Sequence, residues 1–211
     1  MDLQQLSDAV ITGNAPAAKA LTEAALAEGV TPATIVNDGL IAAMGVVGER
    51  FGRGEIYVPE MLLSARAMQT ALAVLEPLMA KSDIVSRGTV VIGTVKGDVH
   101  DIGKNIVAIM LKGSGFTVHD MGVDVPAERF VEAIRELRPD VLGLSALLTT
   151  TMAGMHTVIE ALENAGVRDQ VKVIVGGAPV TEEFARSIGA DGYGRDAGEA
   201  AERTRQLIRA S

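Results

Sequence analysis

The chain has no cysteine among its 211 residues. Disulfides, iron–sulfur clusters, zinc–thiolate sites and cysteine nucleophiles are therefore excluded together. Tryptophan is also absent, and aromatic residues make up only 3% of the chain, although hydrophobic residues make up 48%. The hydrophobic core must therefore be built almost entirely from aliphatic side chains.

The chain also lacks basic clusters, a leader-like N-terminus and long apolar runs. Its formal net charge of −8 argues against a nucleic-acid surface. Residues 1–5 lack the basic and apolar regions of a signal peptide. The longest apolar run, residues 39–48, is too short to cross a membrane. These absences predict a cytoplasmic protein with neither nucleic acid nor membrane as a partner.

Hydrophobic periodicity predicts helices in the first part of the chain. They cover residues 2–12, residues 15–28, a stretch that begins at Pro32 and includes Val47, and residues 59–80. Four helices with short connections are typical of a small four-helix bundle. The segment from Phe51 to Val58 is predicted to be a loop that exposes apolar side chains.

The periodicity changes after residues 81–88, which are predicted to be a linker. Strands are expected at residues 89–95, 116–120, 140–146, 171–176 and 191–193, and helices at residues 103–113, 126–137, 151–165, 181–188 and 197–209. This alternation predicts an α/β fold, a Rossmann-like, doubly wound sheet of five parallel strands. The expected domains are a helical cap at residues 1–82 and an α/β domain at residues 88–211.

One stretch of the second domain, residues 90–105, has the pattern of a buried strand, a polar turn and the start of a helix. Such a corner binds ligands in α/β folds. The dinucleotide motif Gly-x-Gly-x-x-Gly does not match the glycine spacing here. A P-loop fails as well, because five residues separate Gly97 from Gly103. What remains is Asp98-x-His100-x-x-Gly103.

Two further motifs follow in order, Ser145-x-Leu147 and Gly176-Gly177. With the Asp-x-His-x-x-Gly pattern before them, the chain resembles the cobalamin-binding module of methionine synthase. It is still more similar to the cognate corrinoid proteins of three-component methyltransferase systems. The resemblance covers nearly the whole chain, because these proteins also carry an N-terminal four-helix bundle.

The resemblance implies that His100 is the lower axial cobalt ligand of a bound cobalamin, a corrinoid that is methylcobalamin in the loaded state. The cofactor's own dimethylbenzimidazole would leave the metal, and its nucleotide tail would enter the α/β domain. Neutral imidazole is a good cobalt ligand, and Asp98 is placed to accept the proton of its other nitrogen. Thr151, where the family often has serine, would extend this relay. Protonation of the His100–Asp98 pair would weaken the axial bond and favour Co(I).

The resemblance also implies a set of cofactor contacts around the pair. Small residues would admit the tail, among them Gly93, and the hydroxyls of Ser145 and Thr149 would bind it. An apolar cap would shield the methyl-bearing face from water. The implied contacts are Gly97, Asp98, Val99, His100, Asp101, Gly103, Ser145, Leu147, Thr149, Gly176, Gly177, Tyr193 and Ala197 in the α/β domain, and Phe51 and Val58 in the cap.

The function that follows from the resemblance is methyl transport. The chain would accept a methyl group from a substrate-specific methyltransferase and pass it to a second methyltransferase, as one component of the system rather than a complete enzyme. The methyl donor stays open among methanol, methylamines, betaines and methoxylated aromatics. The acceptor stays open between tetrahydrofolate and a thiol coenzyme.

Three alternatives compete with this interpretation. A cobalamin subunit of an adenosylcobalamin-dependent mutase shares the Asp-x-His-x-x-Gly pattern but usually lacks the helical bundle. A light-sensing cobalamin regulator would need a basic DNA-binding domain and typically a tryptophan. A receiver-like signalling domain would need an aspartate where Ser145 stands. Without its motif context, His100 would be read as an ordinary loop histidine.

Overall fold

The computed structural model describes residues 3–79 and 86–209. The chain divides into two compact units. One extends through Ser86 and includes Gly113–Gly115, and the other comprises Arg87–Lys112 and the residues from Phe116 onward. Most of the predicted linker lies outside the described residues, so the predicted domain boundaries remain predictions.

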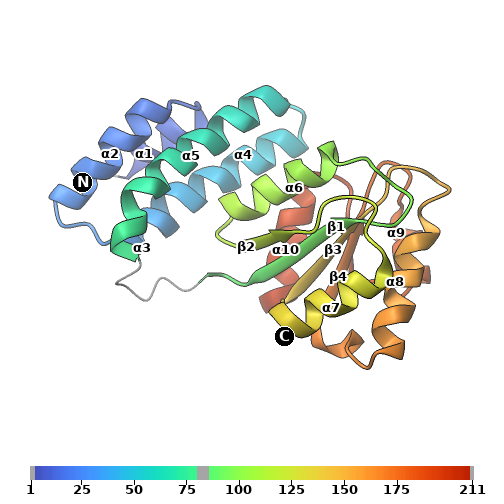
Figure 1. Ribbon diagram of the computed structural model, residues 1–211. Coiled ribbons are helices and arrows are strands. Elements are labelled where there is room, and N and C mark those ends of the chain that lie inside the picture. Colours follow the sequence, from blue (N-terminus) through green and yellow to red (C-terminus); the bar gives the residue numbers. More distant parts are fainter. Residues whose placement is uncertain (1–2, 80–85, 210–211) are drawn as a thin grey trace. The chain divides into compact units, whose positions relative to one another are not determined.

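Helices make up the first unit, as the periodicity predicts, and Figure 1 shows them side by side. They are α1 (Gln4–Ile11), α2 (Ala15–Ala27), a continuous helix formed by α3 (Pro32–Thr34), the π-helical η1 (Ile35–Ile41) and α4 (Ala42–Gly52), and α5 (Val58–Met79). Side chains cap two of the starts: Asn14 Oδ1 accepts from Ala17 N, and Thr31 Oγ1 accepts from Thr34 N. None of the described helices combines the length and apolarity needed for a membrane span.

The sequence did not predict the π-helical segment η1. Its Gly39 lies against α1, where an added Cβ would be 3.1 Å from a methyl group of Leu6. Ser7 Oγ donates to the Gly39 carbonyl at 3.0 Å, so α1 also satisfies part of the altered hydrogen-bond ladder. These are tertiary contacts, which helical periodicity does not reveal.

The loop predicted from Phe51 to Val58 is shorter than expected. Phe51 lies in the last turn of α4, and Val58 is the first residue of α5. Both side chains are half-buried, whereas Ile56 is buried and only Tyr57 is strongly exposed, at 67%. The prediction that the whole segment exposes its apolar residues is therefore wrong for Ile56, which the first unit uses in its core.

The second unit is built on a five-stranded, all-parallel sheet, which confirms the predicted fold class. Its strands, in the order β2-β1-β3-β4-β5, are β1 (Thr89–Thr94), β2 (Thr117–Asp120), β3 (Val141–Ser145), β4 (Lys172–Gly176) and β5 (Gly192–Gly194). The register aligns Thr94, Ser145, Gly176 and Gly194 in one row at the carboxyl edge of the sheet. Loops that are far apart in sequence therefore begin side by side.

Helices cover both faces of this sheet (Figure 1). They are α6 (Ile102–Gly113), α7 (Ala127–Leu137), α8 (Ala153–Asn164), α9 (Glu182–Ser187) and α10 (Ala197–Arg209), with a short 3₁₀ turn, η2 (Arg168–Gln170). The right-handed crossover rule places α6 on the face opposite to α7 and α8, because β2 and β3 lie on opposite sides of β1. Coverage of both faces explains the nearly continuous buried runs of β1, β3 and β4.

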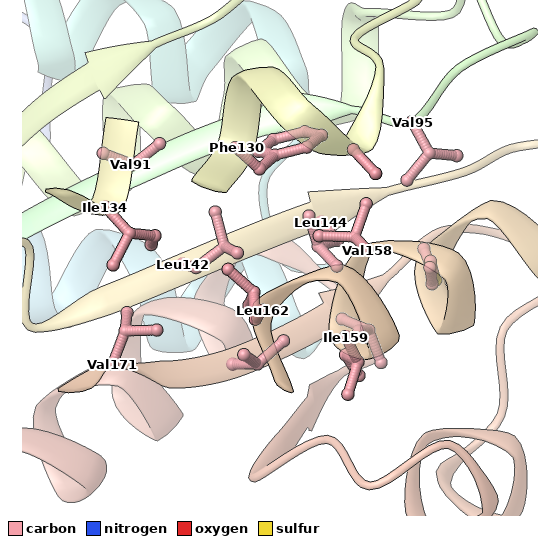
Figure 2. Packing of buried hydrophobic residues seen from close by; sticks show 14 of the residues in the cluster. Val91, Val95, Phe130, Ile134, Leu142, Leu144, Val158, Ile159, Leu162 and Val171 are labelled. Carbon is pink, nitrogen blue, oxygen red and sulfur yellow. The ribbon is translucent and has the colours of Figure 1, made fainter. Parts of the chain in front are cut away.

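The core between the sheet and α7 and α8 is aliphatic except for Phe130 (Figure 2). Phe130 is fully buried, so its replacement by alanine should cost about 3–5 kcal/mol. Its ring lies 2.8 Å from the position that a Cβ on Gly93 would occupy. Gly93 therefore makes room for Phe130, and its place along a ligand slot stays a prediction.

Candidate functional site

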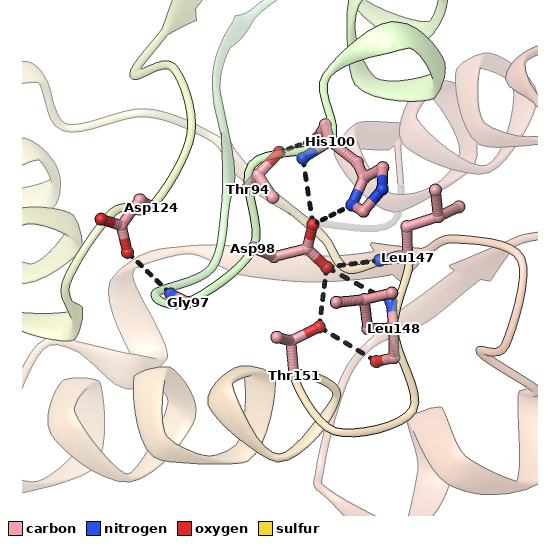
Figure 3. Close-up of polar contacts among 8 residues, drawn as sticks. All are labelled: Thr94, Gly97, Asp98, His100, Asp124, Leu147, Leu148 and Thr151. Carbon is pink, nitrogen blue, oxygen red and sulfur yellow. Dashed lines mark hydrogen bonds and ion pairs between the residues drawn. The ribbon is translucent and has the colours of Figure 1, made fainter.

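The candidate site lies at the carboxyl ends of β1 and β3, where the strand order reverses. The chain leaves β1 toward β2 on one side, and β3 lies on the other side, so the two loops part at this point. Such a switch point is the usual ligand crevice of doubly wound sheets. The loop after β1 carries Asp98 and His100, and the loop after β3 carries Leu147 and Thr151 (Figure 3).

Asp98 is fully buried and joins these two loops. Its Oδ1 accepts from the backbone N of His100 at 3.0 Å and is 2.7 Å from His100 Nδ1. Its Oδ2 accepts from Leu147 N at 2.7 Å, from Leu148 N at 3.3 Å and from Thr151 Oγ1 at 2.7 Å. The structure thus brings together Asp98, His100 and Thr151, as the resemblance implies.

These bonds determine where the protons are. Burial alone would raise the pKa of Asp98, but the hydrogen bonds from Thr151, Leu147 and His100 together hold it well below its usual range. Asp98 is therefore a carboxylate, which only accepts hydrogen bonds. His100 Nδ1 must then carry the proton, and in the neutral ring Nε2 keeps its lone pair.

The Nε2 side of His100 is accessible. The side chain is 45% exposed, and no described residue forms a hydrogen bond with Nε2. A neutral imidazole whose other nitrogen is held by a carboxylate is the usual arrangement of a metal-binding histidine. The described residues contain no group of three or more histidine, aspartate or glutamate side chains that could hold a metal ion. A single histidine suits a metal that a macrocyclic cofactor already coordinates, because such a metal needs only one axial ligand from the protein.

The backbone of His100 is fixed at both ends. Its N–H bonds to Asp98, and its carbonyl accepts from the buried Thr94 Oγ1 at 2.9 Å. The turn before it needs Gly97, which has φ +83° and donates its N–H to Asp124 Oδ1 at 2.7 Å. Because α6 begins only at Ile102, Asp98 lies too far before that helix to cap it.

Four exposed apolar side chains lie close to His100 in sequence or on the loop after β3 that binds Asp98. Val99 is 70% exposed and Ile102 is 75% exposed, and the two following β3, Leu147 and Leu148, are each 42% exposed. A cluster of exposed aliphatic residues marks a binding surface. We call these four residues the apolar rim. If a corrin is bound here, His100 would hold its metal and the apolar rim would supply apolar contacts to the ring.

Other implied contacts lie along the same edge. Ser145 and Thr149 have hydroxyls without a hydrogen bond to any described residue, so both remain available to a ligand. Gly103 has open space where a Cβ would point. Asp101 is exposed, and its Oδ2 accepts from Asn105 Nδ2 at 3.1 Å.

The glycine pair serves contacts within the protein. Gly177 has φ +139°, and an added Cβ would lie only 1.9 Å from the carbonyl oxygen of Ala146. A Cβ on Gly176 would lie 2.8 Å from the carbonyl oxygen of Gly194. Because they lack a Cβ, Gly176 and Gly177 let the chain at the end of β4 pack closely against the chain at the ends of β3 and β5. This is a packing role, distinct from direct contact with a ligand.

The remaining implied contacts are less accessible or lie elsewhere. Tyr193 is half-buried in β5, where burial, followed by the charge of Glu199, raises the pKa of its hydroxyl. Ala197 begins α10 and is only 5% exposed. Phe51 and Val58 belong to the first unit, so their role as a cap stays a prediction.

Several functional features escaped the sequence reasoning. Thr94 anchors the His100 carbonyl from inside a strand, where a threonine carries no signal of its own. The amides of Leu147 and Leu148 bind Asp98 through backbone atoms, which no residue pattern reveals. Ile102 begins α6 and continues its apolar helical spacing, so the sequence gives no sign that its side chain is 75% exposed.

Comparison with known proteins agrees with this site. Residues 88–202 match the family described as B12 binding domain, and residues 2–76 match a second family with the same description. The chain is 46% identical over 207 residues to the dimethylamine corrinoid protein of Methanosarcina barkeri, covering 98% of this chain and 97% of that protein. It is 48% identical over 193 residues to the trimethylamine corrinoid protein of Methanosarcina barkeri, covering 90% and 89%.

A solved structure is similar over the same length. A chain of the methanol:cobalamin methyltransferase complex MtaBC from Methanosarcina barkeri superimposes with a TM-score of 0.84 at 32% identity. The superposition covers 99% of this chain and 80% of that chain. The likeness therefore includes the helical unit as well as the α/β unit.

Proposed function

This chain belongs to the B12-binding family of corrinoid proteins, and we propose that it carries a methyl group from a substrate-specific methyltransferase to a second methyltransferase. Its cofactor is cobalamin, a corrinoid. When bound, the cobalt supplies the atom that holds the methyl group between the two transfers. The observation that carries the proposal is the partly exposed imidazole of His100, whose Nδ1 is held by the Asp98 carboxylate while Nε2 has no hydrogen bond to a described residue.

Each residue of the site has a task that follows from its contacts. His100 would bind the cobalt through Nε2, while Asp98 holds the Nδ1 proton and keeps the ring oriented. Thr151 donates to Asp98 and stabilises its negative charge. The apolar rim would exclude water from the lower face of the ring. Hydrogen bonds from Thr151, Leu147 and His100 lower the pKa of Asp98, which favours the carboxylate with the shared proton on the imidazole.

The methyl donor that we propose is a methylated amine. This rests on the names of two relatives, a dimethylamine and a trimethylamine corrinoid protein, at 46% and 48% identity. Those values are too close to choose between the two amines. Spectrophotometric assay of the cobalamin-loaded chain with dimethylamine and trimethylamine methyltransferases tests this class, and methylation by neither would contradict it.

The mutase interpretation is less well supported. The relatives that match over nearly the whole chain, including the helical unit, are corrinoid proteins. The similar solved structure is part of a methyltransferase complex. Both observations favour a methyl carrier that meets methyltransferase partners over a subunit of a mutase.

The axial bond can be tested without any partner enzyme. The chain is produced with nitrogen-15 histidine, loaded with cobalamin and reduced to the paramagnetic Co(II) state. An axial nitrogen splits the electron paramagnetic resonance lines, into triplets for nitrogen-14 and doublets for nitrogen-15. We expect triplets for unlabelled protein and doublets for the labelled protein, because the bound nitrogen comes from the protein.

Two results would contradict the proposal. Triplets that persist in the labelled protein would show that the cofactor's own base still binds the cobalt. Retention of the doublets in a His100→Ala variant would show that another histidine is the ligand. His156→Ala is the matched control, because His156 is an exposed histidine on α8 outside the site, and it should leave the doublets unchanged.

A further inference from the structure

Lys104 is a buried cation that the proposed chemistry does not use. It lies in the first turn of α6, directly after Gly103, and its side chain is only 1% exposed. Lysine is almost never fully buried unless it is paired. The positive end of the helix macrodipole is also at this first turn, where a cation is unfavourable. A lysine here must therefore be compensated by other groups.

The compensation comes from the neighbouring strand. Lys104 Nζ lies 2.6 Å and 2.5 Å from the two carboxylate oxygens of Asp120, the last residue of β2. It also donates to Asn105 Oδ1 at 2.8 Å. Asp120 Oδ1 accepts from Gly122 N at 2.8 Å, which fixes the carboxylate. All three ammonium protons are thus satisfied by groups of the protein itself.

Through Lys104 and Asp120, these bonds connect the segment that follows the His100 loop to strand β2. Asp98 and Thr94 hold His100 directly, on the β1 and β3 side. Lys104 holds the first turn of α6, four residues further along the chain, on the β2 side. Asn105 extends the connection back toward the loop, since its Nδ2 donates to Asp101 Oδ2. The loop that carries the imidazole is therefore fixed at both of its ends.

We propose that Lys104 is a positioning residue for His100, and that the ion pair of its buried ammonium with the partly exposed Asp120 sets the direction in which Nε2 points. This inference rests on the proposed function, in which Nε2 binds cobalt. An ion pair with one buried partner adds little net stability compared with apolar residues of similar size, and the best-documented role of such pairs is to fix one arrangement among several. Lys104 therefore acts on the geometry of the axial bond more than on folding.

The test uses the full chain loaded with cobalamin and reduced to the Co(II) state. Wild type, Lys104→Met and Lys112→Met are compared by the fraction of bound corrinoid that shows the histidine nitrogen splitting. Lys112 lies in the last turn of the same helix, is exposed and has no hydrogen bond or ion pair with a described residue. We expect Lys112→Met to match wild type, and Lys104→Met to lose at least half of the split signal. Corrinoid affinity should fall about 10-fold, as for other residues that orient a metal ligand.

A double-mutant cycle shows whether the pair acts as a unit. Asp120→Asn should also reduce the split fraction, and the double variant should be no worse than Lys104→Met alone. Far-UV circular dichroism checks that each variant is folded. Lys104→Gln, which keeps a hydrogen-bond donor without the charge, replaces Lys104→Met if that variant does not fold.

The outcomes separate this inference from the proposed function. If the histidine nitrogen splitting is absent from wild type, or persists in His100→Ala, the proposed function fails and the role of Lys104 fails with it. If wild type shows that signal and Lys104→Met keeps the full split fraction, only the role of Lys104 is overturned. A lower melting temperature with an unchanged split fraction would also overturn it, because Lys104 would then serve stability alone.

Discussion

Asp98 Oδ1 and His100 Nδ1 lie 2.7 Å apart, and the other carboxylate oxygen of Asp98 lies 2.7 Å from the hydroxyl of Thr151. The first contact spans two positions in the sequence and the second spans 53. One buried carboxylate therefore connects the loops after β1 and β3 and orients the imidazole. Its replacement should affect stability and cofactor binding together.

Asp98→Asn should destabilise the cofactor-free protein by about 2–4 kcal/mol, because the neutral amide leaves buried donors without an ionised acceptor. The amide would also place its own N–H groups against those donors. Urea unfolding at pH 7 measures the change. Asp101→Asn, at an exposed residue of the same loop, should stay within about 0.5 kcal/mol of wild type. Equal effects of both variants would show that burial of Asp98 is not the cause.

The contribution of Asp98 to stability should depend on pH with a definite sign. Its pKa is lower in the folded chain than in the unfolded chain, so folding gains stability wherever the carboxyl is ionised in both states. That gain is complete above the unfolded pKa, about 4, and is lost as the pH falls toward the folded value. The free-energy difference between wild type and Asp98→Asn should be constant from about pH 5 to 7 and shrink below about pH 4. A difference that grows on acidification would contradict the assignment.

Gly177→Ala should be strongly destabilising, by more than about 3 kcal/mol, because its Cβ would collide with the Ala146 carbonyl in an unfavourable backbone conformation. Gly189→Ala is the matched control. Gly189 also has a positive φ, +76°, but open space around its Cβ position, so only the conformational cost of about 1 kcal/mol applies. Thermal and urea unfolding distinguish the two. Similar losses would mean that backbone conformation, and not the contact between the loops, explains Gly177.

Ile102→Asn should separate binding from stability. Because Ile102 is 75% exposed in the cofactor-free chain, its unfolding free energy should change by no more than about 0.5 kcal/mol. Cobalamin affinity should fall roughly tenfold, since covering such a side chain contributes about 1–2 kcal/mol. Equilibrium titration of each protein with cobalamin measures this affinity.

The control for Ile102→Asn is Leu137→Asn. Leu137 is also exposed, at 41%, but it ends α7 just before β3 and so lies at the opposite edge of the sheet. The cobalamin affinity of the Leu137→Asn variant should match that of wild type. Loss of affinity in both variants would indicate a general effect of removing apolar surface.

Periodicity within the chain was sufficient to predict the order of the five strands and five α-helices described in the second unit, but not the short 3₁₀ turn η2. The strands observed at Thr89–Thr94 and Val141–Ser145 fall within the expected ranges. Helix α8 begins at Ala153 instead of residue 151, because Thr151 belongs to the turn that binds Asp98. The observed start of this helix differs from the predicted one because tertiary hydrogen bonds at the site compete with helical hydrogen bonds.

The sequence by itself determined the fold class, the position of His100 after a buried strand and the presence of Asp98 beside it. These follow from local patterns, since side-chain periodicity and turn residues act over a few positions. Only the tertiary structure decided that Lys104 turns inward to Asp120, that Gly93 makes room for Phe130 and that Gly177 admits Ala146. Such contacts depend on strand order and register, which bring distant residues within a few ångströms and which no local pattern encodes.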